Sequence, residues 1–189
     1  MKAHPGITLD LRLSDTEFDL IEGSYDVALR NMELQDSSLM GRKLADDTRV
    51  LCASPEYLST SGGPAHPRDL VEHQLIAFKD LNPRLLVGPG GAKTSFDPRG
   101  SRSRLINDDG LSQKIATLNG AGMSLNSLWS VHQKLRSGQL VRVLPDWTAE
   151  AQSALWLVYP QSNVISVKVR VFIGFLLKSP GNVAEWASP

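Results

Sequence analysis

The side chains that could ligate a metal or attack a substrate are few and scattered. The sequence has four histidines, and none lies three or four residues from another: His4, His66, His73 and His132. Cys52 is the single cysteine, so neither a structural zinc site nor an internal disulfide is expected. Its apolar neighbours in the segment 50–53 predict a buried thiol that packs as a small hydrophobic group. No metal and no cofactor are expected.

Two glycine-rich segments resemble nucleotide-binding loops without matching them. In the segment 87–94, Val87 and Ala92 stand where the phosphate loop G-x-x-x-x-G-K-[ST] requires glycine. The segment 120–122 lacks the third glycine of a dinucleotide-binding fingerprint. No G-x-S-x-G nucleophile motif occurs either. Both segments are therefore interpreted as glycine-rich turns.

Asp108 and Asp109 are adjacent carboxylates that could serve either catalysis or helix capping. Acid/base catalysis needs two groups whose environments separate their pKa values. Neighbouring acids at the start of a helix are more simply explained as N-cap and first-turn residues, which the helix dipole favours. The capping interpretation is preferred, and an enzyme is not expected.

Composition and charge fit one folded chain without a nucleic-acid surface. Of 189 residues, 41% are hydrophobic and 21% charged, and 20 basic residues balance 20 acidic ones. The densest basic group, Arg99, Arg102 and Arg104, is flanked by acidic residues and is interpreted as a solvated face. The first residues carry no signal peptide, and no long apolar span follows, so a cytoplasmic protein is expected.

The first half of the sequence predicts alternating strands and helices. Alternating apolar residues predict a strand over 7–13, and a capping box of Ser14 and Glu17 then opens a helix that ends near Gly23. A strand over 26–30 completes a βαβ unit, which predicts a parallel sheet.

Further strands are expected over 49–53, 75–78 and 85–87. Ser54 should cap a short helix with Pro55 at its first position. Residues 92–102 are expected to be irregular.

The second half repeats this logic. Residues 107–109 offer N-cap oxygens to a helix whose apolar face carries Leu111, Ile115 and Leu118. A strand over 122–125 precedes a helix capped by Ser127 and ended by Gly138. Strands over 140–144 and 155–159 and an amphipathic helix beginning at Ser166 complete the chain.

Many short segments follow one another in a specific order and spacing, among them Asp26-Val27-Ala28-Leu29-Arg30, Cys52-Ala53-Ser54-Pro55-Glu56-Tyr57-Leu58, His73-Gln74-Leu75-Ile76, Gly120-Ala121-Gly122-Met123, Gly138-Gln139-Leu140-Val141 and Val158-Tyr159-Pro160. Each segment is a weak signal alone. Together, over residues 5 to about 177, they resemble the effector-binding domain of LysR-type transcriptional regulators.

The resemblance implies an α/β fold like that of periplasmic binding proteins, with two Rossmann-like lobes joined by crossover strands. Regulatory lobe I would hold residues 1–48 and 160–189, and regulatory lobe II would hold residues 49–159. The first strand-helix unit of the family's domain, together with the winged helix-turn-helix that precedes it, has no counterpart in this sequence.

The resemblance also implies a small-molecule effector bound between the lobes, outside the carboxyl ends of the strands. Arg30 ends its strand there and could bind an organic acid, with a surface salt bridge as the alternative. Asn107 and Ser127 begin helices whose free N–H groups favour an anion, although Asp108 and Asp109 oppose a strongly anionic ligand at the first of these. The complete expected set of effector-binding residues is Arg30, Asn31, Phe78, Asn107, Asp108, Asn126 and Ser127.

The function implied is that of a ligand-sensing regulatory domain that forms a homodimer or tetramer, contacts no membrane, and reaches DNA only through the missing N-terminal domain. A second hypothesis is a truncated dimerisation or interaction fragment that has lost effector binding. A third is an enzyme on the same lobed fold, although no residue set here predicts a reaction. Uptake of a small acid would separate the first hypothesis from the second.

Overall fold

The computed structural model describes residues 4–13, 25–32, 39–79, 83–100, 102–150, 154–160 and 165–178. The chain forms two compact units. Unit 1 comprises residues 1–46 and 153–189, and unit 2 comprises residues 47–152. The residue ranges of the two units are similar to those expected for the two lobes. The lobe boundaries and their regulatory roles stay a prediction.

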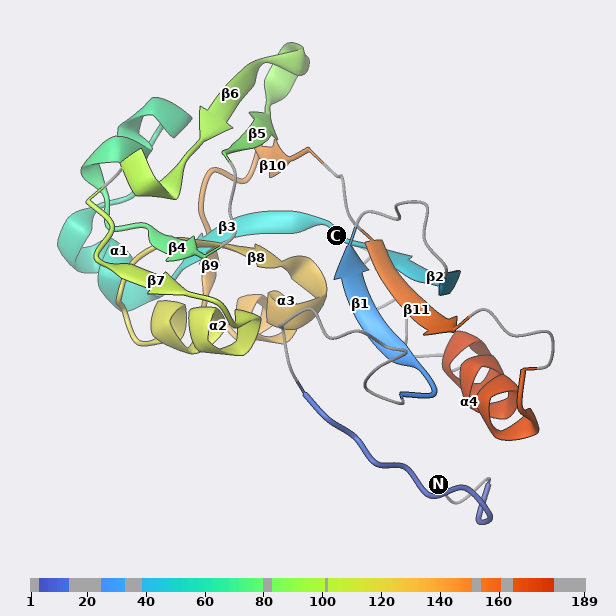
Figure 1. The fold of residues 1–189 in the computed structure, drawn as a ribbon. Helices are drawn as coiled ribbons and strands as arrows, with labels where there is room; N and C mark the ends of the chain where they lie inside the picture. The colour runs from blue at the N-terminus through green and yellow to red at the C-terminus, as the bar shows by residue number, and fades with distance from the viewer. Residues whose placement is uncertain are drawn as a thin grey trace. The chain divides into compact units, whose positions relative to one another are not determined.

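Unit 1 contains a three-stranded sheet in the order β1-β11-β2 (Figure 1). Its strands are β1 (Ala28–Met32), β2 (Leu39–Asp46) and β11 (Ala154–Pro160), and both pairings are antiparallel. The parallel sheet predicted from the βαβ pattern is therefore wrong for these strands, because the partner of β1 comes from the end of the chain. The expected helix over 14–23 lies outside the described residues.

Helix α4 (Val167–Lys178) packs against this sheet, which confirms the expected amphipathic helix. The core between them holds Leu157 and Tyr159 from β11 with Val169 and Ile173 from the helix. The two strand residues are two positions apart and the two helix residues are four positions apart, so each pair lies on one face of its element.

The strand predicted over 7–13 is absent from the structure. Residues 7–13 have no regular secondary structure, and the side chains of its leucines are exposed, Leu13 to 87%. An alternating pattern forms a strand only beside a partner, and no described strand hydrogen-bonds to this segment.

Unit 2 is built on two sheets. In the first, β3 (Arg49–Ala53) lies between β8 (Ser124–Ser127) and β9 (Val141–Arg142), antiparallel to both. In addition, β4 (Ile76–Phe78) pairs in parallel with β7 (Leu105–Asn107).

A parallel bridge between Leu75 and Met123 joins these strands into one layer. The backbone N–H of Ile76 donates to the carbonyl oxygen of Met123 over 2.8 Å, and the N–H of Met123 donates to the carbonyl oxygen of Gln74 over 2.9 Å. Strands β7, β4 and β8 consequently run in the same direction, and their carboxyl ends meet at one edge of the layer, called the carboxyl edge below.

The second sheet of unit 2 has the order β10-β5-β6. It consists of β5 (Arg84–Val87), β6 (Lys93–Phe96) and β10 (Thr148–Ala149). The prediction that residues 92–102 are irregular is wrong where β6 forms, because Lys93 to Phe96 pair along the whole of β5.

Three α-helices complete unit 2: α1 (Pro55–Ser61), α2 (Gly110–Leu118) and α3 (Leu128–Arg136). The expected caps are confirmed for α1, where the hydroxyl oxygen of Ser54 accepts from the N–H of Tyr57 and Pro55 is the first helical residue. Among the residues expected to cap α2, Asp109 is the cap, and it accepts from the N–H of Ser112 over 2.6 Å.

The side chains of β3 alternate between two cores on opposite faces of the strand. Leu51 and Ala53 pack with Leu86 of β5 in one cluster. Val50 and Cys52 pack with Val131 of α3, and with half-buried side chains of α2 and α3, in the other. Figure 1 shows the corresponding arrangement, with α2 and α3 on one side of the layer and the β5–β6 hairpin on the other.

The predicted apolar face of α2 is wrong in part. Leu111 and Ile115 are exposed, whereas Gln113 and Thr117 are the helix residues that are fully buried. The side chains that α2 turns inward instead form polar contacts with β8, as described below. No helix of the described residues is long and apolar enough to cross a membrane.

We predict that Gly122→Ala destabilises the chain by roughly 2–4 kcal/mol. Gly122 has φ +150°, and a Cβ atom there would overlap the carbonyl oxygen of Gln74, where β4 and β8 approach each other. Urea denaturation measures the effect. Gly100→Ala is the control, because a Cβ atom at Gly100 meets nothing within 4 Å. Equal stability of the two variants would contradict the prediction.

Candidate functional site

Three of the expected effector-binding residues end the parallel strands at the carboxyl edge of unit 2. Phe78 is the last residue of β4 and pairs with Asn107, the last residue of β7. Ser127 is the last residue of β8. The structure thus brings together, at one sheet edge, residues that lie 20 to 50 positions apart in the sequence. Ligands of open α/β sheets bind at such an edge.

Asn107 is held in place by the neighbouring strand. Its side-chain Nδ2 donates to the main-chain carbonyl oxygen of Ala77 over 3.3 Å. Its own main-chain carbonyl oxygen accepts from the N–H of Lys79 over 2.6 Å. Its buried Oδ1 has no hydrogen-bond partner among the described residues. The adjacent Asp108 is exposed. Asn107 therefore offers an acceptor at the carboxyl edge that a ligand donor could use.

Ser127 begins α3, but it makes no side-chain cap hydrogen bond there. The first helical N–H, that of Leu128, donates to the carbonyl oxygen of Thr48 over 2.8 Å. The expectation that free N–H groups at this helix start would bind an anion is thus wrong for Leu128.

Asn126 lies inside unit 2, on the face of β8 that α2 covers. Its side chain is 4% exposed, and its Nδ2 donates to the hydroxyl of Ser124 over 2.6 Å and to Sγ of Cys52 over 3.3 Å. Its Oδ1 accepts from Nε2 of Gln113 over 3.3 Å, and Ser124 is hydrogen-bonded to Thr117. These contacts make Asn126 the centre of a buried polar network that joins α2 to the sheet.

Cys52 belongs to the same network and is fully buried. Burial raises the pKa of its thiol to about 11, and the hydrogen bond from Asn126 offsets this only in part. Because the thiolate is the reactive form, the buried thiol predicted from the sequence is confirmed as an inert packing group.

Arg30 and Asn31 belong to unit 1. They are the third and fourth residues of β1, where they pair with Trp156 and Leu155 of β11, and both are half-buried. Their expected role in effector binding stays a prediction.

Sequence reasoning missed a group of charged residues at the same edge of unit 2: Asp47, Arg49 and Arg84. The carboxylate of Asp47 is buried and accepts from Nε of Arg49 over 2.9 Å. Burial lowers the pKa of the nearby Arg84, as does the like charge of Arg49, whereas Asp47 raises it. The available signal was the spacing of two that places Arg49 on the same face of β3 as buried Leu51.

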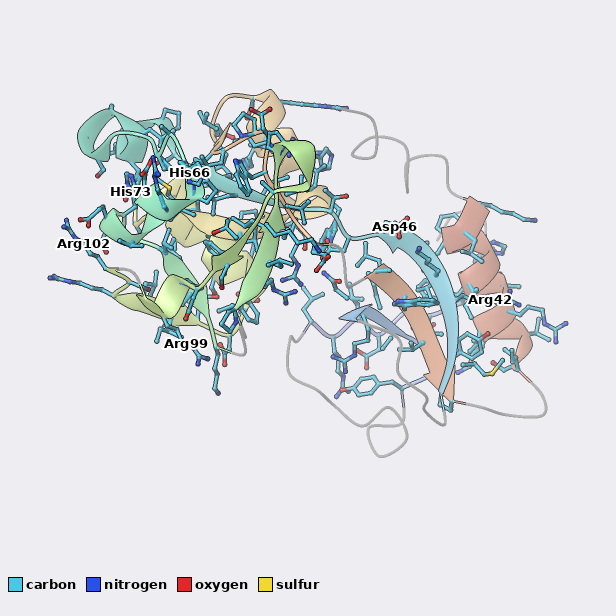
Figure 2. The ribbon with its side chains drawn as sticks, turned by 90° about the horizontal axis from the view of Figure 1, so that it is seen from above. Arg42, Asp46, His66, His73, Arg99 and Arg102 are labelled. Atoms are coloured by element: carbon cyan, nitrogen blue, oxygen red, sulfur yellow. The ribbon has the colours of Figure 1, made fainter. Side chains whose placement is uncertain are left out.

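The basic residues of the segment 99–104 lie at the surface of unit 2 (Figure 2). Arg102 pairs with Glu72 over 2.5 Å, and Arg99 donates to the carbonyl oxygen of Lys79 over 3.0 Å. The interpretation as a solvated face is confirmed for these two residues. In the part of the chain that the structure describes, no three His, Cys, Asp or Glu side chains form a metal-binding group.

Comparison with known proteins identifies the family. A sequence model described as "LysR substrate binding domain" matches residues 1–180. The chain belongs to this family. LysR-type relatives include the HTH-type transcriptional regulator CrgA of Neisseria meningitidis serogroup B, which is 31% identical over 182 residues, covering 95% of this chain and 59% of CrgA. The HTH-type transcriptional activator TtdR of Escherichia coli is 32% identical over 180 residues, covering 93% of this chain and 56% of TtdR.

Solved LysR-type structures share the fold. The full-length structure of the virulence activator AphB of Vibrio cholerae superposes with a TM-score of 0.78 at 29% identity, covering 94% of this chain and 59% of AphB. The expected α/β, periplasmic-binding-protein-like fold is thus confirmed. These relatives are transcription regulators, not enzymes, and the chain spans less than two thirds of their length.

We predict that Asn126→Ala lowers the free energy of unfolding by about 2 kcal/mol, because it removes the buried hydrogen bonds of Asn126 with Gln113 and Ser124. Asn119→Ala serves as the control and should change it by at most about 0.5 kcal/mol, since Asn119 is exposed. Denaturant titration measures both. An unchanged stability of the Asn126 variant, combined with loss of ligand binding, would instead assign Asn126 to the effector site.

Proposed function

We propose that this chain is the ligand-sensing part of a LysR-type transcription regulator that responds to a small organic acid in the cytoplasm. The effector binds at the carboxyl edge of unit 2, and a role of Arg30 and Asn31 of unit 1 in binding stays a prediction. Binding favours one arrangement of the two units over others, and a winged helix-turn-helix of the complete protein transmits the change to DNA.

The observation that carries this proposal is the convergence of Phe78, Asn107 and Ser127 at the ends of three parallel strands. Side chains that end parallel strands lie at the edge of the sheet where ligands of open α/β sheets bind. The buried acceptor of Asn107 gives this edge a polar group that a hydroxyl or other donor of the acid, outside its ionised carboxylate, could satisfy.

We predict that at least one organic acid in a panel of mono- and dicarboxylates raises the melting temperature by about 5 °C or more at about 100 times its Kd. Asn107→Ala should weaken that response, while Asn119→Ala, at an exposed helix end, should leave it unchanged. Differential scanning fluorimetry at constant ionic strength measures the shift. A chain that stays dimeric and takes up no member of the panel would favour the alternative, an interaction fragment without effector binding.

We propose further that the chain self-associates through an apolar face formed by β7 and α2. Leu105 and Ile106 of β7 are exposed to 38% and 65%, and Leu111 and Ile115 of α2 to 55% and 50%. In addition, β7 is an edge strand of its sheet. A second copy of the same face would cover these side chains in a twofold-symmetric contact.

We predict that Ile106→Glu raises the dimer dissociation constant by about tenfold or more, because it places a charge in the middle of this face. Sedimentation-velocity ultracentrifugation over a concentration series measures the constant. Val167→Glu is the matched control, since Val167 is 74% exposed but lies in unit 1. Dimers that tolerate Ile106→Glu as well as Val167→Glu would rule this face out.

A further inference from the structure

The charged residues missed by sequence reasoning lie at the polar end of the main core of unit 2. Side chains two residues apart on a strand share a face. Arg49 therefore lies on the same side of β3 as Leu51, and Arg84 on the same side of β5 as Leu86. Leu51 and Leu86 belong to one buried cluster, so the two arginines approach each other where that cluster ends.

The electrostatic influence of Arg49 and Asp47 on Arg84 agrees with this proximity. The group contains two guanidinium cations and one carboxylate. Asp47 is 2% exposed, and its Oδ2 accepts from Nε of Arg49. This carboxylate therefore forms a salt bridge with one of the two cations, Arg49.

The Nε of Arg84 has no such acceptor. This nitrogen is buried and has no hydrogen-bond partner among the residues that the structure describes. A buried donor without an acceptor is uncommon in proteins and marks a place where a water, an ion or a ligand belongs. The surplus positive charge favours an anion over a neutral group.

The position of the group coincides with the candidate site. Arg49 pairs with Ser127 across β3 and β8, which places the start of β3 at the carboxyl edge. Asp47 is the first residue of unit 2, directly after the chain leaves unit 1. A ligand held by Arg49 and Arg84 would thus lie beside both the strand ends and a connection between the units.

We infer that Arg84, supported by Arg49, binds a carboxylate group of the effector. This inference rests on the proposed function and specifies its ligand, an organic acid rather than a neutral molecule. A guanidinium presents parallel N–H donors that match the two oxygens of a carboxylate, and the pair held by Asp47 keeps Arg49 oriented beside it. The site differs from Arg30, which lies in unit 1.

The first test follows the arginine Nε–Hε signals of the ¹⁵N-labelled 189-residue chain by NMR. The probes are sodium succinate, its neutral analogue succinamide, and inorganic phosphate, each at constant ionic strength. We expect the Arg84 signal to shift and saturate with succinate but not with succinamide. The signal of Arg102, an exposed residue paired with Glu72, should stay unchanged. An Arg84 signal that ignores succinate, responds only to phosphate, or shifts no more than that of Arg102 would overturn the inference.

The second test compares Arg84→Gln with Arg102→Gln. Arg84→Gln should weaken succinate binding by about tenfold or more, while Arg102→Gln should change it less than about twofold. Because Nε of Arg84 has no hydrogen-bond partner among the described residues, and Arg49 repels the guanidinium, Arg84→Gln should melt at about the same temperature as the parent chain or higher. Arg49→Gln should melt lower, because it leaves Asp47 buried without this cation. Undiminished succinate binding by a folded Arg84→Gln chain would also overturn the inference.

The two proposals fail in distinguishable ways. Saturable binding of an uncharged compound that also raises the melting temperature, with the Arg84 signal unmoved, would contradict the inference and leave ligand sensing intact. Succinate binding at Arg84 that produces no change in the small-angle scattering of the chain would support the inference and contradict sensing by rearrangement of the units.

Discussion

Strand β3 buries side chains on both of its faces, and the arrangement of unit 2 depends on this constraint. Leu51 and Ala53 pack towards the β5–β6 hairpin, and Val50 and Cys52 pack towards α2 and α3. A shift of the strand by one residue would exchange these sets and bring Arg49 into the opposite core. Because the register is fixed in this way, the first residues of β3 are held at the carboxyl edge beside the end of β8. The same constraint therefore sets the fold and positions the candidate site.

The sequence predicted the local elements of unit 2 better than those of unit 1, and there is a physical reason. The strands and caps of unit 2, such as β3 and Ser54, are encoded by neighbouring residues. The longest strand of unit 1, β2, was not predicted, because charged residues such as Arg42 and Lys43 interrupt its apolar pattern and it depends on β11, more than 100 residues later, for its hydrogen bonds. Pairing between distant segments leaves little trace in a local pattern, and so the parallel sheet was predicted where an antiparallel one forms.

The candidate site shows the same division. The resemblance to LysR-type regulators indicated strand ends, and Phe78, Asn107 and Ser127 do lie at strand ends. It could not separate these residues from Asn126, whose side chain is turned into the core next to Gln113. It also missed Arg84, which is a candidate only because Arg49 lies near it. Arg49 is 35 positions earlier in the sequence, and only the packing of the fold brings the two residues together. The predicted apolar face of α2 was wrong in part for a related reason. The helix packs on β8 through the polar side chains of Gln113 and Thr117, and the sequence pattern alone does not show their buried hydrogen-bond partners.

The two units differ in how the chain builds them. Unit 2 is one uninterrupted stretch, residues 47–152, whereas unit 1 combines the beginning of the chain with its end. Strand β11 is the central strand of the unit 1 sheet, and it follows all the elements of unit 2 in the chain. During synthesis, unit 2 can therefore fold while β1 and β2 still lack the strand that joins them. The strand ends of unit 2 are therefore in place before the sheet that carries Arg30.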